Sequence, residues 1–93
     1  MPMNRQDLLD STAESAGAEW ATARLGELGA EGRASGGWPG TLGEARGRAA
    51  LAIGIVLRAH RMLAMSHDER ARAATIAYEA ARRAWLHVAR PGA

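Results

Sequence analysis

The sequence predicts an all-α protein of three helices, in which two long helices form an antiparallel hairpin and a shorter N-terminal helix packs against them. Three observations predict this fold. Apolar residues recur at steps of three and four along most of the chain. Residues that start helices precede each periodic segment. A linker at 31–40 is instead dense in Gly, Ser and Pro. With 93 residues, the chain is expected to form a single helical domain.

The first helix is expected at about residues 5–28. Asn4 can cap its start with Asp7 in the first turn, and Ser11 followed by Glu14 offers a second start further along. The Gly-rich end of this helix is hard to place, because each Gly costs about 1 kcal/mol relative to Ala. Its apolar residues form one narrow stripe, which consists of Leu9, Ala13, Ala16, Trp20, Leu25 and Leu28.

Two capping boxes predict where the hairpin helices start. In such a box, a hydroxyl and a carboxylate three residues apart each accept a hydrogen bond from the other residue's backbone N–H. Thr41 with Glu44 forms the first box, and Ser66 with Glu69 forms the second. Because the second box follows the first helix almost at once, the two helices must run antiparallel.

The hairpin helices are expected at about 41–65 and 67–90, with Pro91 and Gly92 stopping the second. Each has an apolar seam with steps of three and four, and the two seams should face each other. Trp85 should be a principal core residue, because the facing seam is mostly Ala. The first seam is Leu42, Ala45, Ala49, Ala52, Val56, Ala59 and Leu63, and the second is Ala71, Ala74, Tyr78, Ala81, Trp85 and Val88.

Apolar side chains remain outside these seams. Leu51 and Ile55 lie far round the first hairpin helix, and the second helix has another stripe at Ala73, Ala77, Ala80 and Ala84. A helix that is apolar nearly all round is expected to be buried nearly all round, so this surplus predicts a second chain. Two hairpins pairing into a homodimeric helical bundle is the expected arrangement. The candidate interface residues are Trp38, Gly43, Gly47, Leu51, Gly54 and Ile55.

The small residues among these candidates have two interpretations. Gly43, Gly47 and Gly54 fall in a band opposite the Ala seam, either as a groove for another helix or as a solvated face in a genome rich in Gly codons. Trp38 stands in a Gly-rich loop, where it either covers an open end of the bundle or anchors a partner. The cover is the favoured interpretation of Trp38.

Catalytic and metal-binding motifs are absent from the sequence. Without Cys there is no thiol nucleophile, and without Lys there is no P-loop or Schiff-base chemistry. The carboxylates are placed as caps or surface pairs. No two of the histidines have the spacing of helical metal ligands, and these are His60, His67 and His87. A non-enzymatic protein with no cofactor and no bound metal is therefore expected.

The basic residues leave a second function open. All twelve are Arg, and the sequence pI is about 10.4, although the net charge is only +2. Phosphate contact is one interpretation. A solvated face is the favoured one, with ion pairs of Asp68 with Arg72 and of Glu79 with Arg83. The candidates for nucleic-acid contact are Arg46, Arg58, Arg61, Arg72, Arg83 and Arg90.

Location and function are expectations at this point. The most apolar run, residues 49–57, is too short to cross a bilayer, and the N-terminus lacks the apolar core of a signal peptide. A bacterial, cytoplasmic protein without membrane contact is expected. The leading hypothesis is a protein–protein interaction module, such as an adaptor, an assembly subunit or a small phage-encoded inhibitor of a larger machine. The alternative is a small Arg-rich regulator that binds nucleic acid.

Overall fold

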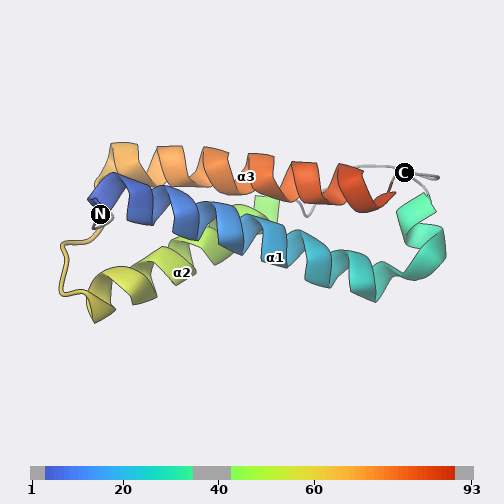
Figure 1. The fold of residues 1–93 in the computed structure, drawn as a ribbon, viewed down its shortest axis with the longest axis horizontal. Coiled ribbons are helices and arrows are strands. Elements are labelled where there is room, and N and C mark those ends of the chain that lie inside the picture. The colour runs from blue at the N-terminus through green and yellow to red at the C-terminus, as the bar shows by residue number, and fades with distance from the viewer. Residues whose placement is uncertain (1–3, 35–42, 90–93) are drawn as a thin grey trace.

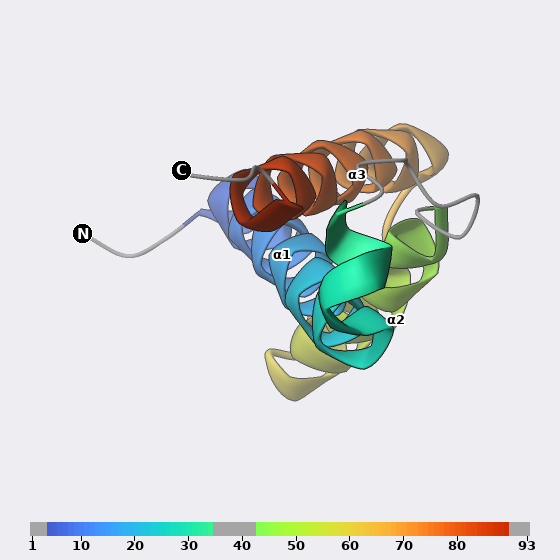
Figure 2. The same ribbon diagram turned by 90° about the vertical axis from the view of Figure 1, so that its right-hand side faces the viewer.

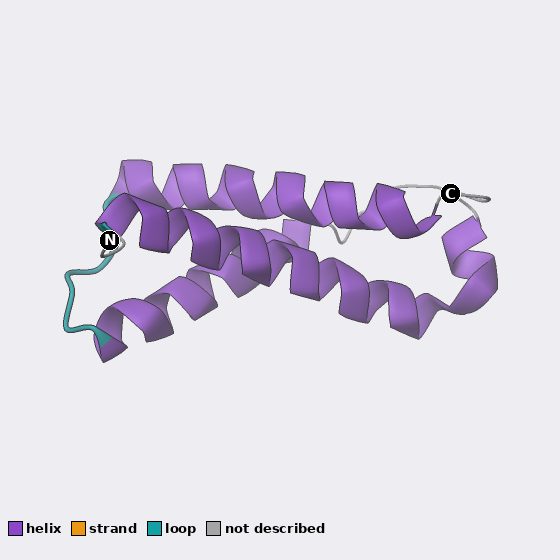
Figure 3. Cartoon of the chain, in the orientation of Figure 1, coloured by secondary structure: helices purple, strands orange, loops and turns teal. Residues whose placement is uncertain are grey.

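The computed structural model describes residues 4–34 and 43–89 of the chain, and these residues form an all-α helical bundle. No strand occurs among the described residues (Figure 3). This confirms the predicted fold class of three helices. The helices are α1 (Arg5–Ala34), α2 (Glu44–Ala59) and α3 (His67–Ala89).

The chain runs up, down and up again through the three helices. α1 and α3 point the same way and lie side by side along the long axis of the bundle (Figure 1). α2 runs in the opposite direction and crosses below them in this view. Viewed from one end, the three helices form a triangle (Figure 2). The bundle measures 44 × 28 × 20 Å. The predicted antiparallel hairpin is present, but its two arms contact each other less than either contacts α1.

α1 is the longest helix, which corrects the prediction of a shorter N-terminal helix. It has 30 residues, against 16 in α2 and 23 in α3. Asn4 caps it as predicted, since its Oδ1 accepts a hydrogen bond from the N–H of Asp7 at 2.8 Å. Ser11 starts no second helix. The helix continues past residue 28, so residues 31–34 of the predicted linker are helical, and 35–40 lie outside the described residues. The Ala, Leu and Glu around each Gly are strong helix formers and offset its cost.

The start of α2 lies at the edge of the described residues. Glu44 is the first residue of the α-helix, and Gly43 before it already has helical backbone angles, with a φ of −61° and a ψ of −19°. The predicted box of Thr41 with Glu44 depends on Thr41, which lies outside the described residues. The position of Glu44 is still favourable, because a carboxylate in the first turn opposes the positive end of the helix dipole.

α2 ends earlier than predicted, at Ala59. The N–H of Met62 donates to the carbonyl of Leu57 at 2.8 Å, and that of Arg61 donates to the carbonyl of Arg58 at 3.1 Å. Arg61 has a φ of 55°. This pattern is a Schellman motif, in which the left-handed position is usually Gly. Because Arg occupies it here, the sequence lacks the usual signal of a helix end.

Residues 60–66 consequently form a true connection rather than the minimal turn that the sequence predicts. Its last residue is the predicted cap of α3. The N–H of Ser66 donates to Glu69 Oε1 at 2.9 Å, and the N–H of Glu69 donates to Ser66 Oγ at 3.2 Å. The second capping box is confirmed in both of its hydrogen bonds.

The buried residues follow steps of four rather than the predicted alternation of three and four. Residues four apart form a ridge that is inclined to the helix axis, and helices that pack along such ridges cross at an angle, as α2 does against the other two helices (Figure 1). Leu63 of the predicted seam is 85% exposed, Ala59 and Ala71 are also exposed, and Leu42 lies outside the described residues. The core consists of Leu9, Ala13, Ala21, Leu25, Ala45, Ala49, Ile53, Leu57, Ala73, Ala77, Ala80, Ala81 and Trp85.

α1 explains why the second stripe of α3 is buried. Ala73, Ala77 and Ala80 belong to that stripe, and they are covered because α1 lies along this side of α3. At Gly17 the backbone of α1 comes directly against Ala77. Trp85 is 1% exposed, which confirms it as a principal core residue.

Candidate interaction surfaces

The side of α2 that faces away from the core is uncovered. Leu51 is 65% exposed and Ile55 is 60% exposed, although both are large and apolar. A β-carbon added to Gly43, Gly47 or Gly54 would meet no atom within 4 Å. The structure thus brings Gly47, Leu51, Gly54 and Ile55 together on one side of α2, whereas Gly43 precedes the helix. Trp38, the remaining candidate, lies outside the described residues.

This surface is narrow and centred on Leu51. At about 100° per residue, seven residues of α2 project within about 60° of Leu51, counting Leu51 itself. The buried residues of α2 project more than about 100° away, on the opposite side. We define the outer face of α2 as Glu44, Gly47, Arg48, Leu51, Gly54, Ile55 and Arg58. All are exposed except Gly54, which is half-buried.

A groove of about 660 Å³ runs beside the outer face, between α1 and α2. Its α1 wall combines the apolar surface of Trp20 and Ala23 with the charged groups of Glu19 and Arg24. Its α2 wall is formed by Glu44, Arg48, Leu51, Ala52 and Ile55. Both walls therefore offer apolar contact flanked by charges of both signs, which suits a helix with a mixed surface.

A second apolar surface lies on the connection between α2 and α3. Leu63 is 85% exposed and Met62 is 37% exposed. They border a shallow hollow of about 510 Å³. Arg5 and Glu69 also line this hollow, but most of its exposed surface comes from apolar atoms. Sequence reasoning missed this surface because it placed Leu63 on a helical seam that ends before reaching it.

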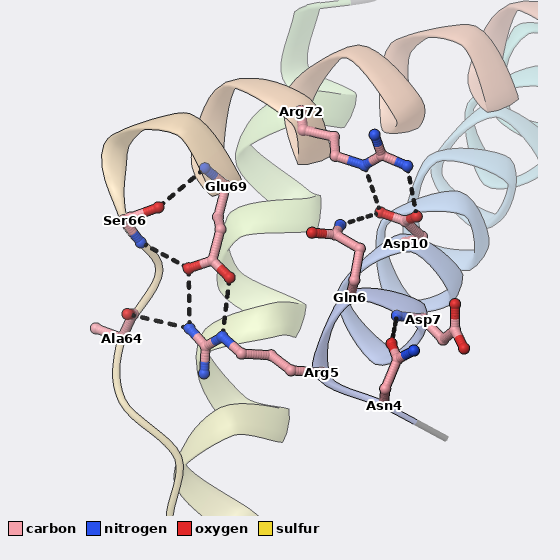
Figure 4. A network of polar contacts seen from close by, with 9 residues as sticks. All are labelled: Asn4, Arg5, Gln6, Asp7, Asp10, Ala64, Ser66, Glu69 and Arg72. Atoms are coloured by element: carbon pink, nitrogen blue, oxygen red, sulfur yellow. Dashed lines mark hydrogen bonds and ion pairs between the residues drawn. The ribbon is translucent and has the colours of Figure 1, made fainter. Parts of the chain in front are cut away.

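Two ion pairs join the beginnings of α1 and α3 (Figure 4). Arg5 Nε donates to Glu69 Oε2 at 2.8 Å and Arg5 Nη2 donates to Glu69 Oε1 at 3.0 Å. Arg5 Nη2 also donates to the carbonyl of Ala64 at 3.2 Å. One guanidinium thus ties α1 both to α3 and to the connection that precedes it.

The second ion pair lies one turn further along. Arg72 Nε and Nη2 donate to the two carboxylate oxygens of Asp10 at 3.1 and 2.9 Å, and Gln6 Nε2 donates to Asp10 Oδ1 at 2.7 Å. The sequence had predicted Asp68 as the partner of Arg72. The carboxylate across the helix interface takes that place, because its geometry allows two parallel hydrogen bonds.

These contacts shift the protonation of both carboxylates. Hydrogen bonds from Arg5, helped by the backbone N–H of Ser66, lower the pKa of Glu69 to about 2. Hydrogen bonds from Arg72, helped by Gln6, lower the pKa of Asp10 below its ordinary value. A carboxylate held ionised by a guanidinium is a poor general acid or base at neutral pH. This polar network joins the first turns of α1 to the first turns of α3.

The candidate nucleic-acid residues do not share one surface. Arg46 lies over the ring of Tyr78 at 4.8 Å, Arg72 pairs with Asp10, and Arg83 Nη2 lies 3.7 Å from Glu14 Oε1. These three have partners within the chain. The others differ in kind: Arg58 is exposed on the outer face of α2, Arg61 is exposed at the end of α2, and Arg90 lies outside the described residues.

The described residues contain no group of three His, Asp or Glu side chains that could hold a metal ion. His60, His67 and His87 are each exposed, at the end of α2 and on α3. None of the three described helices combines the length and the apolar character that a membrane-crossing segment needs.

The fold and the exposed surfaces define the class of molecule: a small three-helix bundle in which the outer face of α2 exposes two large apolar residues, Leu51 and Ile55. Comparisons with family models, with curated proteins and with solved structures find no match for the chain.

Proposed function

We propose that this chain is a non-enzymatic protein–protein interaction module that binds through the outer face of α2. The observation that supports this is the exposure of Leu51 and Ile55, one turn apart and bordered by a groove. Single exposed apolar residues are ordinary, but a contiguous apolar patch with a polar rim is typical of an interaction site. Glu44, Arg48 and Arg58 supply such a rim.

Interaction with nucleic acid draws less support from the same residues. A nucleic-acid reader needs several unpaired cations on one side of the molecule. Here Arg72 and Arg83 face carboxylates of α1, and Glu44 shares the outer face with Arg48 and Arg58. This mixture of signs suits a protein surface better than a phosphate backbone.

Photo-crosslinking from the outer face tests the proposal. The residue at Leu51 is replaced by a photoreactive phenylalanine derivative and the protein is irradiated in the cells that make it. We expect covalent adducts with protein, because a residue at the centre of an interface lies within contact distance of its partner. The matched control carries the same group at Thr75, which is exposed on α3.

The comparison between the two positions decides the outcome. Adducts from position 51 that exceed those from position 75, and that disappear when Ile55→Arg is added, support the proposal. Equal adducts from both positions would reject it. Adducts with nucleic acid from position 51 would favour the alternative function instead.

A further inference from the structure

We infer that the outer face of α2 binds the same face of a second copy of this chain, with the two α2 helices antiparallel and a two-fold axis beside Leu51. This inference rests on the proposed function and names its partner. The supporting observation is that the residues seven positions before and after Leu51 on this face have opposite charges.

The charges of the face are arranged symmetrically about Leu51 with opposite sign. Glu44 lies seven residues before Leu51 and Arg58 lies seven residues after it. In an antiparallel pair centred on Leu51, residues at equal distances before and after the centre come to the same level. Glu44 of each copy then faces Arg58 of the other, which makes two ion pairs. In a parallel pair, like charges would meet at both ends.

The sizes of the side chains complement each other in the same way. Gly47 lies four residues before Leu51 and Ile55 lies four residues after it. The two-fold axis therefore brings the Ile55 side chain of one copy to the level of Gly47 of the other. At about 100° per residue, Gly47 and Ile55 project about 40° to opposite sides of Leu51, so they lie diagonally across the interface, and the open space above Gly47 lets the two helices come close on its side. On the two-fold axis, Leu51 of one copy packs against Leu51 of the other.

The groove beside the outer face supports the same partner. It is lined by α1 and α2, so a second α2 lying on the outer face would also reach Trp20 and Ala23. The two copies of α1 and α2 then form a four-helix layer, a common way for helix pairs to bury a remaining apolar face. Such an isologous contact closes on itself and leaves no open edge.

The helix dipole offers a different account of the charges alone. A carboxylate at the start of a helix and a guanidinium in its last turn are both favourable within one chain. That account leaves Leu51 and Ile55 exposed without reason, and it does not require Gly at position 47. Charge reversal separates the two explanations, because only pairing between copies allows one reversal to compensate for the other.

The first experiment measures dimerisation by sedimentation equilibrium up to about 100 μM, a range that detects micromolar association. We expect Glu44→Arg and Arg58→Glu each to weaken dimerisation by about tenfold or more, since each places like charges opposite one another twice. The double variant, with both reversals, should return to within about threefold of the original dissociation constant. Thermal melts of each variant confirm that the monomer still folds.

The second experiment uses cysteine cross-linking, which is free of background because the chain has no Cys. Helices packed about 8 Å apart bring the two Leu51 α-carbons within disulfide range, so Leu51→Cys should form a covalent dimer on mild oxidation. The two copies of residue 58 are about 21 Å apart along the helices, so Arg58→Cys alone should not. A mixture of Glu44→Cys and Arg58→Cys chains should cross-link to each other.

Each outcome has a definite meaning. Cross-linking of Arg58→Cys with itself would overturn the antiparallel register. A monomer throughout the concentration range would overturn self-association. If position 51 nevertheless forms photo-adducts with another protein, the proposed function stands and only the partner changes. If neither dimers nor adducts form, both proposals fail.

Discussion

Gly17 on α1 lies directly against the backbone of Ala77 on α3. A β-carbon on Gly17 would overlap the carbonyl oxygen of Ala77 and lie 2.9 Å from its carbonyl carbon and from its α-carbon. Real β-carbons essentially never come so close to backbone atoms. The two helices therefore depend on Gly at this position for their separation. α1 and α3 make the most extensive contact in the bundle, so the absence of a β-carbon at Gly17 determines how closely the helices of its main interface can approach.

We expect Gly17→Ala to destabilise the protein by about 1–3 kcal/mol, the usual cost of forcing an extra carbon into a packed site. Helix propensity alone predicts the opposite sign, a gain of about 1 kcal/mol. The matched control is Gly26→Ala in the same helix, where a β-carbon would meet nothing within 4 Å. That variant should be stabilised. Chemical denaturation of both variants measures the difference, and effects of the same sign would contradict the close contact.

Trp85 is the largest side chain of the core, and it packs among Ala21, Leu25, Ala45 and Ala81. Trp85→Ala should destabilise the protein by about 3–5 kcal/mol, because the small neighbours cannot fill the cavity that it leaves. Leu63→Ala is the comparison, since the sequence placed both residues on facing seams. Because Leu63 is 85% exposed, Leu63→Ala should change the melting temperature little. A large loss from Leu63→Ala in the monomer would restore the predicted seam.

Arg61 holds a left-handed backbone conformation, with a φ of 55°. Such a conformation costs a residue with a β-carbon about 1 kcal/mol or more. Arg61→Gly removes this strain of about 1 kcal/mol, but Gly also has more conformational entropy in the unfolded chain, which opposes folding. The free energy of unfolding should therefore rise by less than about 1 kcal/mol. Arg61→Ala removes the same charge but keeps the β-carbon, so it should stay close to the original. Equal stability of the two variants would show that the backbone is not strained here.

Acid should weaken the protein through the polar network of Figure 4. The pKa of Glu69 is about 2 in the folded chain, below its ordinary value of 4.5. A lowered folded pKa means that the folded state favours the ionised carboxylate. Its contribution is therefore complete above pH 4.5 and is lost as the pH falls toward 2. The lowered pKa of Asp10 acts in the same direction.

Denaturation midpoints between these two pH values measure this effect. Glu69→Gln keeps the shape of the side chain but removes the titrating group, so its stability should fall less steeply with acid than that of the original chain. Glu79→Gln, an exposed change on the same helix away from the network, should keep the original slope. A Glu69→Gln slope as steep as the original would contradict the role of the ion pair.

Local signals in the sequence predicted local structure well. Asn4 and the box of Ser66 with Glu69 were identified because a cap involves residues only three apart. The end of α2 was missed because Arg61 stands where the motif normally has Gly. The length of α1 was missed because its Gly residues suggested an end, whereas their neighbours support a continuous helix.

Contacts between distant segments left no comparable signal. Arg5 and Glu69 are 64 residues apart, and no spacing rule pairs them. The buried stripe of α3 depends on the side from which α1 approaches, so the sequence offered two stripes and could not choose between them. Residues that share one side of a single helix follow from the helical period alone, so the sequence already groups Leu51 with Ile55.

The contact between α1 and α3 also has a consequence for the time at which the protein can fold. The helix that is synthesised first finds its principal neighbour in the helix that is synthesised last among the three. On the ribosome, α1 and α2 emerge first and can pack against each other, but the side of α1 that α3 covers has no neighbour until α3 is made. Helical bundles usually fold quickly because their contacts are local. In this chain the decisive contact is non-local, so its formation must follow translation of α3.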